Sequence, residues 1–243
     1  MAKARPERLG WCGGWWHAAT RCPSPNHGAR PRDGDTELAL IHSISLPPGE
    51  YEGDAVQQLF LNRLDPDAHP YYENLRGLRV SAHFFIRRDG AVLQFVACDR
   101  RAWHAGASRW RERNNCNDFS IGIELEGLEG DTFERCQYAV LARLLRALAR
   151  RWGVREAAGH EHVAPGRKHD PGPGFNWQAL KVALRLSRLR LPAAGTDGVR
   201  PAEAKTRPAR ADVDLHRAPP GRAGHTIARR RQPFGKPLNK HYR

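Results

Sequence analysis

The chain lacks the cysteine patterns of disulfide-stapled proteins and of zinc knuckles. It holds five cysteines in 243 residues, an odd number, and no two of them stand at CxxC spacing. Disulfide frameworks and structural zinc sites both depend on regular cysteine spacing. The cysteine content therefore argues against both and fits a reducing cytosol. We interpret Cys116 and Cys136 as small buried hydrophobes rather than nucleophiles.

Long hydrophobic runs are also missing. No apolar run approaches the ~18 residues that a membrane-spanning helix needs. The N-terminus, Met1 to Arg8, has basic residues but no apolar stretch after them, so it does not read as a secretory signal. We expect a cytoplasmic protein that does not engage a membrane.

Acidic residues are scarce relative to basic ones, and the imbalance is uneven. The chain has 40 Lys and Arg against 26 Asp and Glu, a net charge of +14. Residues 193–243 hold 12 of the basic and 4 of the acidic residues, so they carry +8 of that charge. This stretch has almost no aliphatic periodicity and is rich in Pro, Gly and Arg, which predicts a disordered basic tail after a domain over residues 1–192. The tail is either a contact for anionic polymers or a solvated segment without specific function.

The hydrophobic pattern of residues 1–192 predicts an α/β fold. Asp89-Gly90 between two short apolar runs is a hairpin signal. Residues 9–36 read as irregular. Strands are expected at 38–41, 82–86, 91–96 and 120–125, and helices at 55–61, 134–152 and 177–189. Strands and helices that alternate around a hairpin favour a mixed central β-sheet flanked by helices.

The densest group of reactive side chains lies in the loop from Gly159 to Pro173, which holds three histidines, a lysine and an aspartate. His42, where the apolar run 38–41 ends, is the best further ligand candidate. With His160 and Asp170 it makes a two-histidine, one-carboxylate set, which is typical of catalytic zinc with one position open for water. Because no HExxH motif is present, the helical metalloprotease arrangement is excluded.

Two further side chains suit hydrolysis. Strand alternation places Glu124 on the same face as Gly122 and Glu126, where a carboxylate near a metal acts as general base or acid. The alternative is an ion-paired or hydrogen-bonding strand residue. Lys168 stands two residues before Asp170. It is either a donor to a developing oxyanion or a surface lysine.

Four other histidines have weaker or different signals. His162 and His169 are near the candidate ligands in sequence only. His83 is expected to be a hydrogen-bonded core or outer-shell histidine. His104 stands in a glycine-containing turn, where it either lines a sugar or peptide groove or fills a packing corner.

Six segments, in order and at matching spacing, resemble the AmpD family of N-acetyl-anhydromuramyl-L-alanine amidases. They are 41–50, 78–83, 86–90, 101–106, 116–127 and 159–173. The resemblance spans roughly residues 9–190 and stops at the tail. It implies a fold like that of peptidoglycan-recognition proteins and phage lysozyme-type amidases.

The resemblance also implies a mechanism. The family's zinc ligands fall on His42, His160 and Asp170, its catalytic glutamate on Glu124 and its catalytic lysine on Lys168. The implied cofactor is Zn²⁺. The implied reaction hydrolyses the amide between the lactyl group of anhydro-N-acetylmuramic acid and L-alanine of the stem peptide, in cytosolic peptidoglycan recycling.

Substrate contacts are expected at Arg79 and Trp103, with a muropeptide as the partner and the protein as a monomer. Two positions depart from the family pattern: Ser43 replaces an asparagine, and Asn115 replaces an arginine that Arg113 could substitute for only if the loop differs. Two other functions remain open, a muropeptide-binding module without catalysis and a lytic amidase acting on intact peptidoglycan.

Overall fold

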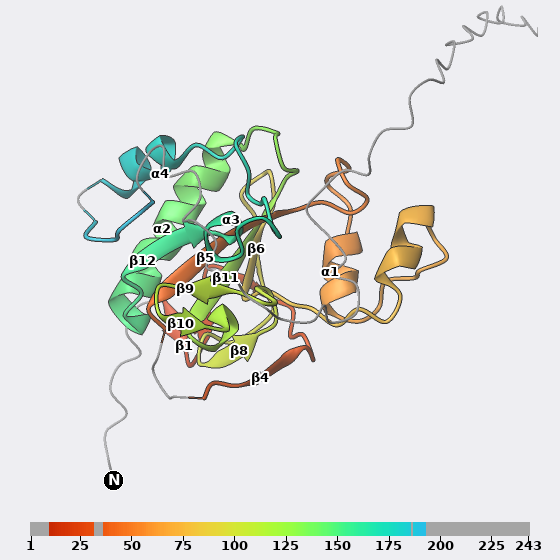
Figure 1. Cartoon of the computed structure of the whole chain (residues 1–243), viewed down its shortest axis with the longest axis horizontal. Coiled ribbons are helices and arrows are strands. Elements are labelled where there is room, and N and C mark those ends of the chain that lie inside the picture. Colours follow the sequence, from red (N-terminus) through yellow and green to blue (C-terminus); the bar gives the residue numbers. More distant parts are fainter. Residues whose placement is uncertain (1–9, 32–35, 186, 193–243) are drawn as a thin grey trace, which may run out of the picture.

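The fold is built on a six-stranded mixed sheet, seen in a computed structural model that describes residues 10–31, 36–185 and 187–192 (Figure 1). The strand order is β12-β5-β11-β6-β7-β3. β12, β5, β11 and β6 are parallel, β6 and β7 are antiparallel, and β3 runs parallel to β7. The predicted mixed sheet with flanking helices is confirmed. The predicted tail, 193–243, lies outside the described residues.

The strands of this sheet are mostly short, and the two longest are neighbours in its interior. Every residue of β5 (Leu38–Ile44) and β11 (Ser120–Glu126) is buried. Strands covered on both faces are usually near-continuous apolar runs, so the polar residues within β5 and β11 stand out. The other four are β3 (Thr20–Arg21), β6 (Phe84–Ile86), β7 (Val92–Gln94) and β12 (Glu156–Gly159). The predicted hairpin is the β6–β7 pair, whereas β12 was not predicted.

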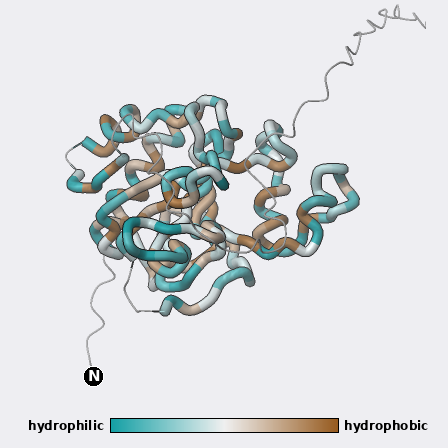
Figure 2. The backbone as a smooth tube through the Cα atoms, in the orientation of Figure 1, coloured by the Kyte–Doolittle hydropathy of each residue, from teal (hydrophilic) through white to brown (hydrophobic). Residues whose placement is uncertain are grey.

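Residues 9–36, expected to be irregular, include several short strands. β1 (Trp11–Cys12) pairs with β2 (Trp15–Trp16), and β4 (His27–Ala29) pairs with β8 (Arg100–Ala102). β3 and β4 pair with β7 and β8, far along the chain, which no local pattern reveals, and β1 and β2 form a local hairpin of only two residues a strand. A further hairpin joins β9 (Arg109–Trp110) and β10 (Arg113–Asn114). It is mostly hydrophilic, in contrast to the central strands (Figure 2).

Two helices cover one face of the sheet (Figure 1). α2 (Arg135–Trp152) buries Leu141, Leu145 and Leu148 against Ile121 and Ile123 of β11, as the helical spacing of its apolar residues predicts. α4 (Trp177–Leu184) packs on α2 and is five residues shorter than expected. After it the chain turns, and Arg190 forms a parallel bridge with Glu156 at the edge of the sheet.

The opposite face carries a second cluster, formed with α1 (Ala55–Phe60) and the 3-10 helix η1 (Pro70–Leu75). A third, smaller cluster lies near the start of β5, beside the 3-10 helix η2 (Cys116–Asp118) and α3 (His160–Val163). Within the part of the chain that is described, no helix combines the length and apolarity that crossing a bilayer requires.

All five cysteines are free thiols in the structure. Cys116 is buried, as predicted, but Cys136 is exposed, so its interpretation as a buried hydrophobe was wrong. It stands at the N-terminal end of α2, off the stripe that packs on the sheet.

Candidate active site

Three parallel strands bring the predicted site residues to the same end of the sheet. The register pairs Glu124 of β11 with His42 of β5, and Gly159 of β12 with Ile41, the residue before His42. His160 follows Gly159 and begins α3. Because parallel strands have their carboxyl ends at one edge, side chains 118 residues apart in sequence become neighbours. His42 lies within its strand rather than at its end, since β5 continues to Ile44.

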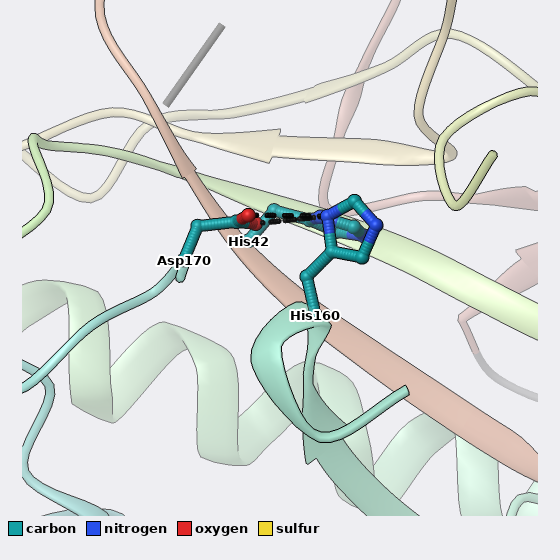
Figure 3. Close-up of side chains that lie close together, drawn as sticks. All are labelled: His42, His160 and Asp170. Carbon is teal, nitrogen blue, oxygen red and sulfur yellow. Dashed lines mark hydrogen bonds and ion pairs between the residues drawn. The ribbon is translucent and has the colours of Figure 1, made fainter. Parts of the chain in front are cut away.

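His42, His160 and Asp170 form a compact buried group (Figure 3). One ligand atom from each lies within 4.8 Å of the others. His42 Nδ1 is 2.9 Å from Asp170 Oδ2 and 3.1 Å from His160 Nδ1. His160 Nδ1 is 3.1 Å from Asp170 Oδ1 and 3.2 Å from Oδ2. The structure thus brings together the three residues that were predicted as ligands.

This geometry fits a tetrahedral metal ion. Zinc binds nitrogen and oxygen at about 2.0–2.2 Å, which places adjacent tetrahedral ligand atoms about 3.3–3.6 Å apart. The observed separations of 2.9 to 3.2 Å are somewhat shorter, so a small outward movement of the side chains would accommodate the ion. Two imidazoles and one carboxylate are also the ligand chemistry of catalytic zinc, and all three side chains are buried.

A turn after α3 returns the chain to the histidines. The amide of Glu161 donates to the carbonyl of Asp170 at 2.9 Å, which fastens the two ends of the turn. Gly159 makes this closure possible, because a Cβ there would come within 2.7 Å of Pro171. A larger residue at position 159 would push Pro171, and Asp170 with it, away from the histidines.

Glu124 lies beside His42, its partner in the pairing of β11 with β5. It is 4% exposed, on the face of β11 opposite the core residues Ile123 and Leu125, as alternation predicts. Its Oε2 is buried without a hydrogen-bond partner among the described residues. Burial, and next the charge of Asp170, raise the pKa of Glu124 well above its usual value, while Lys168 lowers it. The unpartnered Oε2 does not show the pairing expected of an ion-paired or hydrogen-bonding strand residue, which was the alternative.

Lys168 is not a surface residue. It is 6% exposed, and its charge acts on Glu124. The short turn that carries it is held by the amide of Lys168, which donates to the carbonyl of Ala164 at 3.0 Å. The alternative of an ordinary surface lysine is therefore wrong, since the turn between α3 and Asp170 folds Lys168 inward.

The weaker ligand candidates lie outside the group. His162 Nδ1 accepts a hydrogen bond from the amide of Gly159 at 2.9 Å, and its ring meets Trp177 edge to face. His169 is exposed. His83 is a buried, hydrogen-bonded histidine, as expected: Nδ1 accepts from the amide of Gly122 and Nε2 contacts the carbonyl of Arg100, each at 3.0 Å.

His104 has a contact that the sequence did not suggest. Its Nδ1 lies 3.0 Å from Nε2 of the candidate ligand His42. Burial, followed by the neighbouring rings of His42, His83 and His160, lowers the pKa of His104 well below its usual value. Sequence reasoning missed this role because 62 residues separate the two histidines.

The predicted substrate residues lie on other segments. Arg79 is exposed between η1 and β6, and Trp103 is half-buried just after β8. Ser43 is buried in β5. Asn115 adopts a left-handed conformation before η2 and bonds Asp118 through its side chain. Arg113 forms an ion pair with Glu37 and lies over the ring of Phe119. These contacts do not place it where the family's arginine at position 115 would be.

Comparisons with known proteins show the family of this chain. Residues 34–173 match the family model described as N-acetylmuramoyl-L-alanine amidase. The chain is 49% identical over 176 residues to the 1,6-anhydro-N-acetylmuramyl-L-alanine amidase AmpD of Citrobacter freundii, covering 72% of this chain and 94% of that protein. It is 47% identical to the same enzyme of Escherichia coli K12, covering 70% of this chain and 94% of that protein.

A solved structure supports the same assignment. The crystal structure of a selenomethionine AmpD derivative superposes with a TM-score of 0.70 at 46% identity, covering 72% of this chain and 98% of that one. The described strands, helices and site residues lie mostly within the matched family segment. This chain belongs to the N-acetylmuramoyl-L-alanine amidase family, a family of enzymes that act on amide bonds.

Proposed function

We propose that the protein is a zinc-dependent amidase of cytosolic peptidoglycan recycling. Its substrate would be an anhydro-muropeptide, and it would hydrolyse the amide between the lactyl group of anhydro-N-acetylmuramic acid and L-alanine of the stem peptide. The observation that carries the proposal is the buried His42–His160–Asp170 group, with Glu124 and Lys168 beside it. The relatives named as 1,6-anhydro-N-acetylmuramyl-L-alanine amidases support the substrate class.

The metal would be held by His42 Nδ1, His160 Nδ1 and a carboxylate oxygen of Asp170. Zinc in such a set supplies a Lewis acid that polarises a carbonyl and acidifies water. The ligands come from β5, from the start of α3 and from the turn after it, so the sheet and one fastened turn set their relative positions.

Glu124 acts as the proton carrier in this proposal. Its carboxylate takes a proton from the attacking water and passes it to the nitrogen of the leaving alanine, a role for a positioned acid–base group. The backbone at Glu124 is fixed because β11 is hydrogen-bonded to β5 on one side and to β6 on the other. Burial then restricts the positions that its side chain can take.

Lys168 stabilises negative charge on the oxygen of the scissile carbonyl. A buried ammonium near the reacting carbonyl interacts strongly with a developing oxyanion, since little water screens it. Arg79 and Trp103 would contact the substrate away from the reacting bond.

A paired measurement tests the proposal. Purified wild type and Glu124→Ala are compared for zinc content and for release of stem peptide from anhydro-muropeptide. We expect about one zinc per chain in both proteins and hydrolysis only in the wild type. Wild type that binds muropeptide without zinc and without cleavage would indicate a binding module instead. Faster cleavage of intact peptidoglycan than of anhydro-muropeptide would indicate a lytic amidase.

A further inference from the structure

A chain of hydrogen bonds runs from a backbone carbonyl to the candidate ligand His42. The hydroxyl of Ser120 donates to the carbonyl of Cys116 at 2.6 Å. A hydroxyl has one hydrogen, so toward any second partner its oxygen accepts. That partner is His104, whose Nε2 lies 3.3 Å from Ser120 Oγ. Nε2 of His104 therefore carries the ring hydrogen.

This assignment determines the next ring. A neutral imidazole has one N–H, so Nδ1 of His104 is an acceptor. It lies 3.0 Å from Nε2 of His42, which must be the donor. Nδ1 of His42 is then left with its lone pair directed at His160 and Asp170. This is the tautomer that a metal ion needs.

His160 reaches the same state through a different contact. Its Nε2 lies 3.1 Å from the carbonyl oxygen of Ala105, which can only accept, so Nε2 is the donor. Arg167 Nη2 also approaches Nε2, at 3.5 Å. The two hydrogens of that nitrogen are accounted for by shorter contacts, at 2.8 Å to the carbonyl of Ala105 and 2.7 Å to that of Ala107.

One short segment thus supplies both acceptors, and Asn117 holds it in place. The side-chain carbonyl of Asn117 accepts from the amides of His104 at 3.0 Å and Ala105 at 2.8 Å. Gly122 provides the space, since a Cβ there would come within 2.5 Å of the His104 ring. Any side chain at position 122 would displace the imidazole from His42.

We propose that His104 is a positioning residue for the metal ligand His42, and that His104 and the carbonyl of Ala105 together preset both histidines with Nδ1 lone pairs facing one point. The inference rests on the proposed metal site and adds how it is prepared before the ion arrives. With both tautomers set, two nitrogen lone pairs and a carboxylate lie 2.9 to 3.2 Å apart. A cation bound at that point would interact with all three groups at once.

The tautomers of the three histidines can be read directly from the wild-type protein. Long-range ¹H–¹⁵N spectra of the metal-free protein distinguish the two neutral tautomers of each ring, with His42→Gln and His104→Gln used only to assign signals. We expect His42, His104 and His160 all to carry the hydrogen on Nε2. A His42 ring with its hydrogen on Nδ1 would overturn the proposal, whether or not the protein is an amidase.

Metal affinity gives a second readout, measured as the Zn²⁺ dissociation constant in competition with a chelator. His104→Phe keeps a ring but removes the acceptor, and we expect zinc to bind about 10- to 100-fold more weakly. His104→Gln offers a carbonyl to His42 and an amide to Ser120, so it should restore most of the affinity. Gly122→Ala should weaken binding without removing a polar group.

Thermal unfolding of the metal-free proteins separates positioning from folding. A folded His104→Phe with wild-type zinc affinity would overturn the proposal. If His104→Phe does not fold, Ser120→Ala takes its place. It removes the hydroxyl that accepts from Nε2 of His104 and leaves His104 present. Wild type that binds no Zn²⁺ would end the proposed function, while the tautomer spectra would still decide this inference.

Discussion

His42 and Glu124 lie directly opposite each other on the parallel strands β5 and β11. Both side chains are buried, in the two longest strands of the sheet. One pairing register therefore places a candidate metal ligand beside a candidate proton carrier. A shift of either strand by one residue would turn one of them to the opposite face, into the core under α2.

Glu124→Gln should abolish turnover and spare the metal. Loss of a positioned acid–base group costs roughly 10²- to 10⁴-fold in rate, and Glu124 is not one of the three grouped ligands. Stem-peptide release and zinc content are measured on the same preparation. Hydrolysis at the wild-type rate would exclude Glu124 as the proton carrier.

Glu126→Gln is the matched control, two residues along the same strand. Glu126 is buried and accepts from the amides of Glu52 and Arg88, each at 3.0 Å. An amide side chain has only one acceptor oxygen, so one of these donors loses its partner, at a cost of about 1–3 kcal/mol in the free energy of unfolding. We expect lower stability in denaturant unfolding and retained turnover.

Lys168→Met should lower kcat more than it raises KM. Removing one oxyanion donor typically costs on the order of 10²–10³ in kcat. Steady-state kinetics on anhydro-muropeptide separate the two constants. Lys181→Met, at an exposed position on α4, should change neither. An effect on KM alone would mean that Lys168 binds substrate rather than the transition state.

Asp170→Ala and His169→Ala should differ sharply in zinc content. Asp170 contacts both candidate histidine ligands, whereas its neighbour His169 is exposed. We expect the first variant to lose bound zinc after dialysis and the second to retain it, as measured by metal analysis. Equal zinc content in the two variants would place the metal elsewhere.

Stability should fall in mild acid because of His83. Burial, and then the charge of Arg30, hold the pKa of His83 well below its usual 6.5. The unfolded chain binds a proton below that pH and the folded protein does not, so the free energy of unfolding decreases as pH falls, by up to about 1.4 kcal/mol per pH unit for this group. Denaturant unfolding of metal-free protein at pH 8 and pH 5 measures the change. His83→Gln should flatten it, and an unchanged slope would assign the acid sensitivity to other groups.

Removal of residues 193–243 should leave amidase activity and zinc content unchanged. The matched family segment ends at residue 173, and the described residues end at Pro192. The deleted stretch carries +8 of the net charge, so binding to anionic polymers is the property expected to weaken. Loss of hydrolysis on deletion would contradict the predicted domain boundary.

Local patterns in the sequence determined the elements that depend on local physics. Apolar residues at helical spacing predicted α2, and alternation predicted β11 with Glu124 turned away from the core. The composition of the 159–173 loop identified two of the three grouped residues, and the end of an apolar run pointed to the third. In each case the signal lies within about 20 residues, the range over which periodicity and turn chemistry act.

Only the tertiary structure decided what depends on pairing between distant segments. The strands β3 and β4 and the edge strand β12 all depend on partners far along the chain. The same holds for His104, whose turn shows nothing unusual until β5 and β11 pair and Gly122 leaves room for its ring. Burial also depended on the tertiary structure. Lys168, in a polar turn, is buried, whereas the Cys136 thiol is exposed. Residue type sets which chemistry is available, but hydrogen-bond partners and burial are properties of the packed fold.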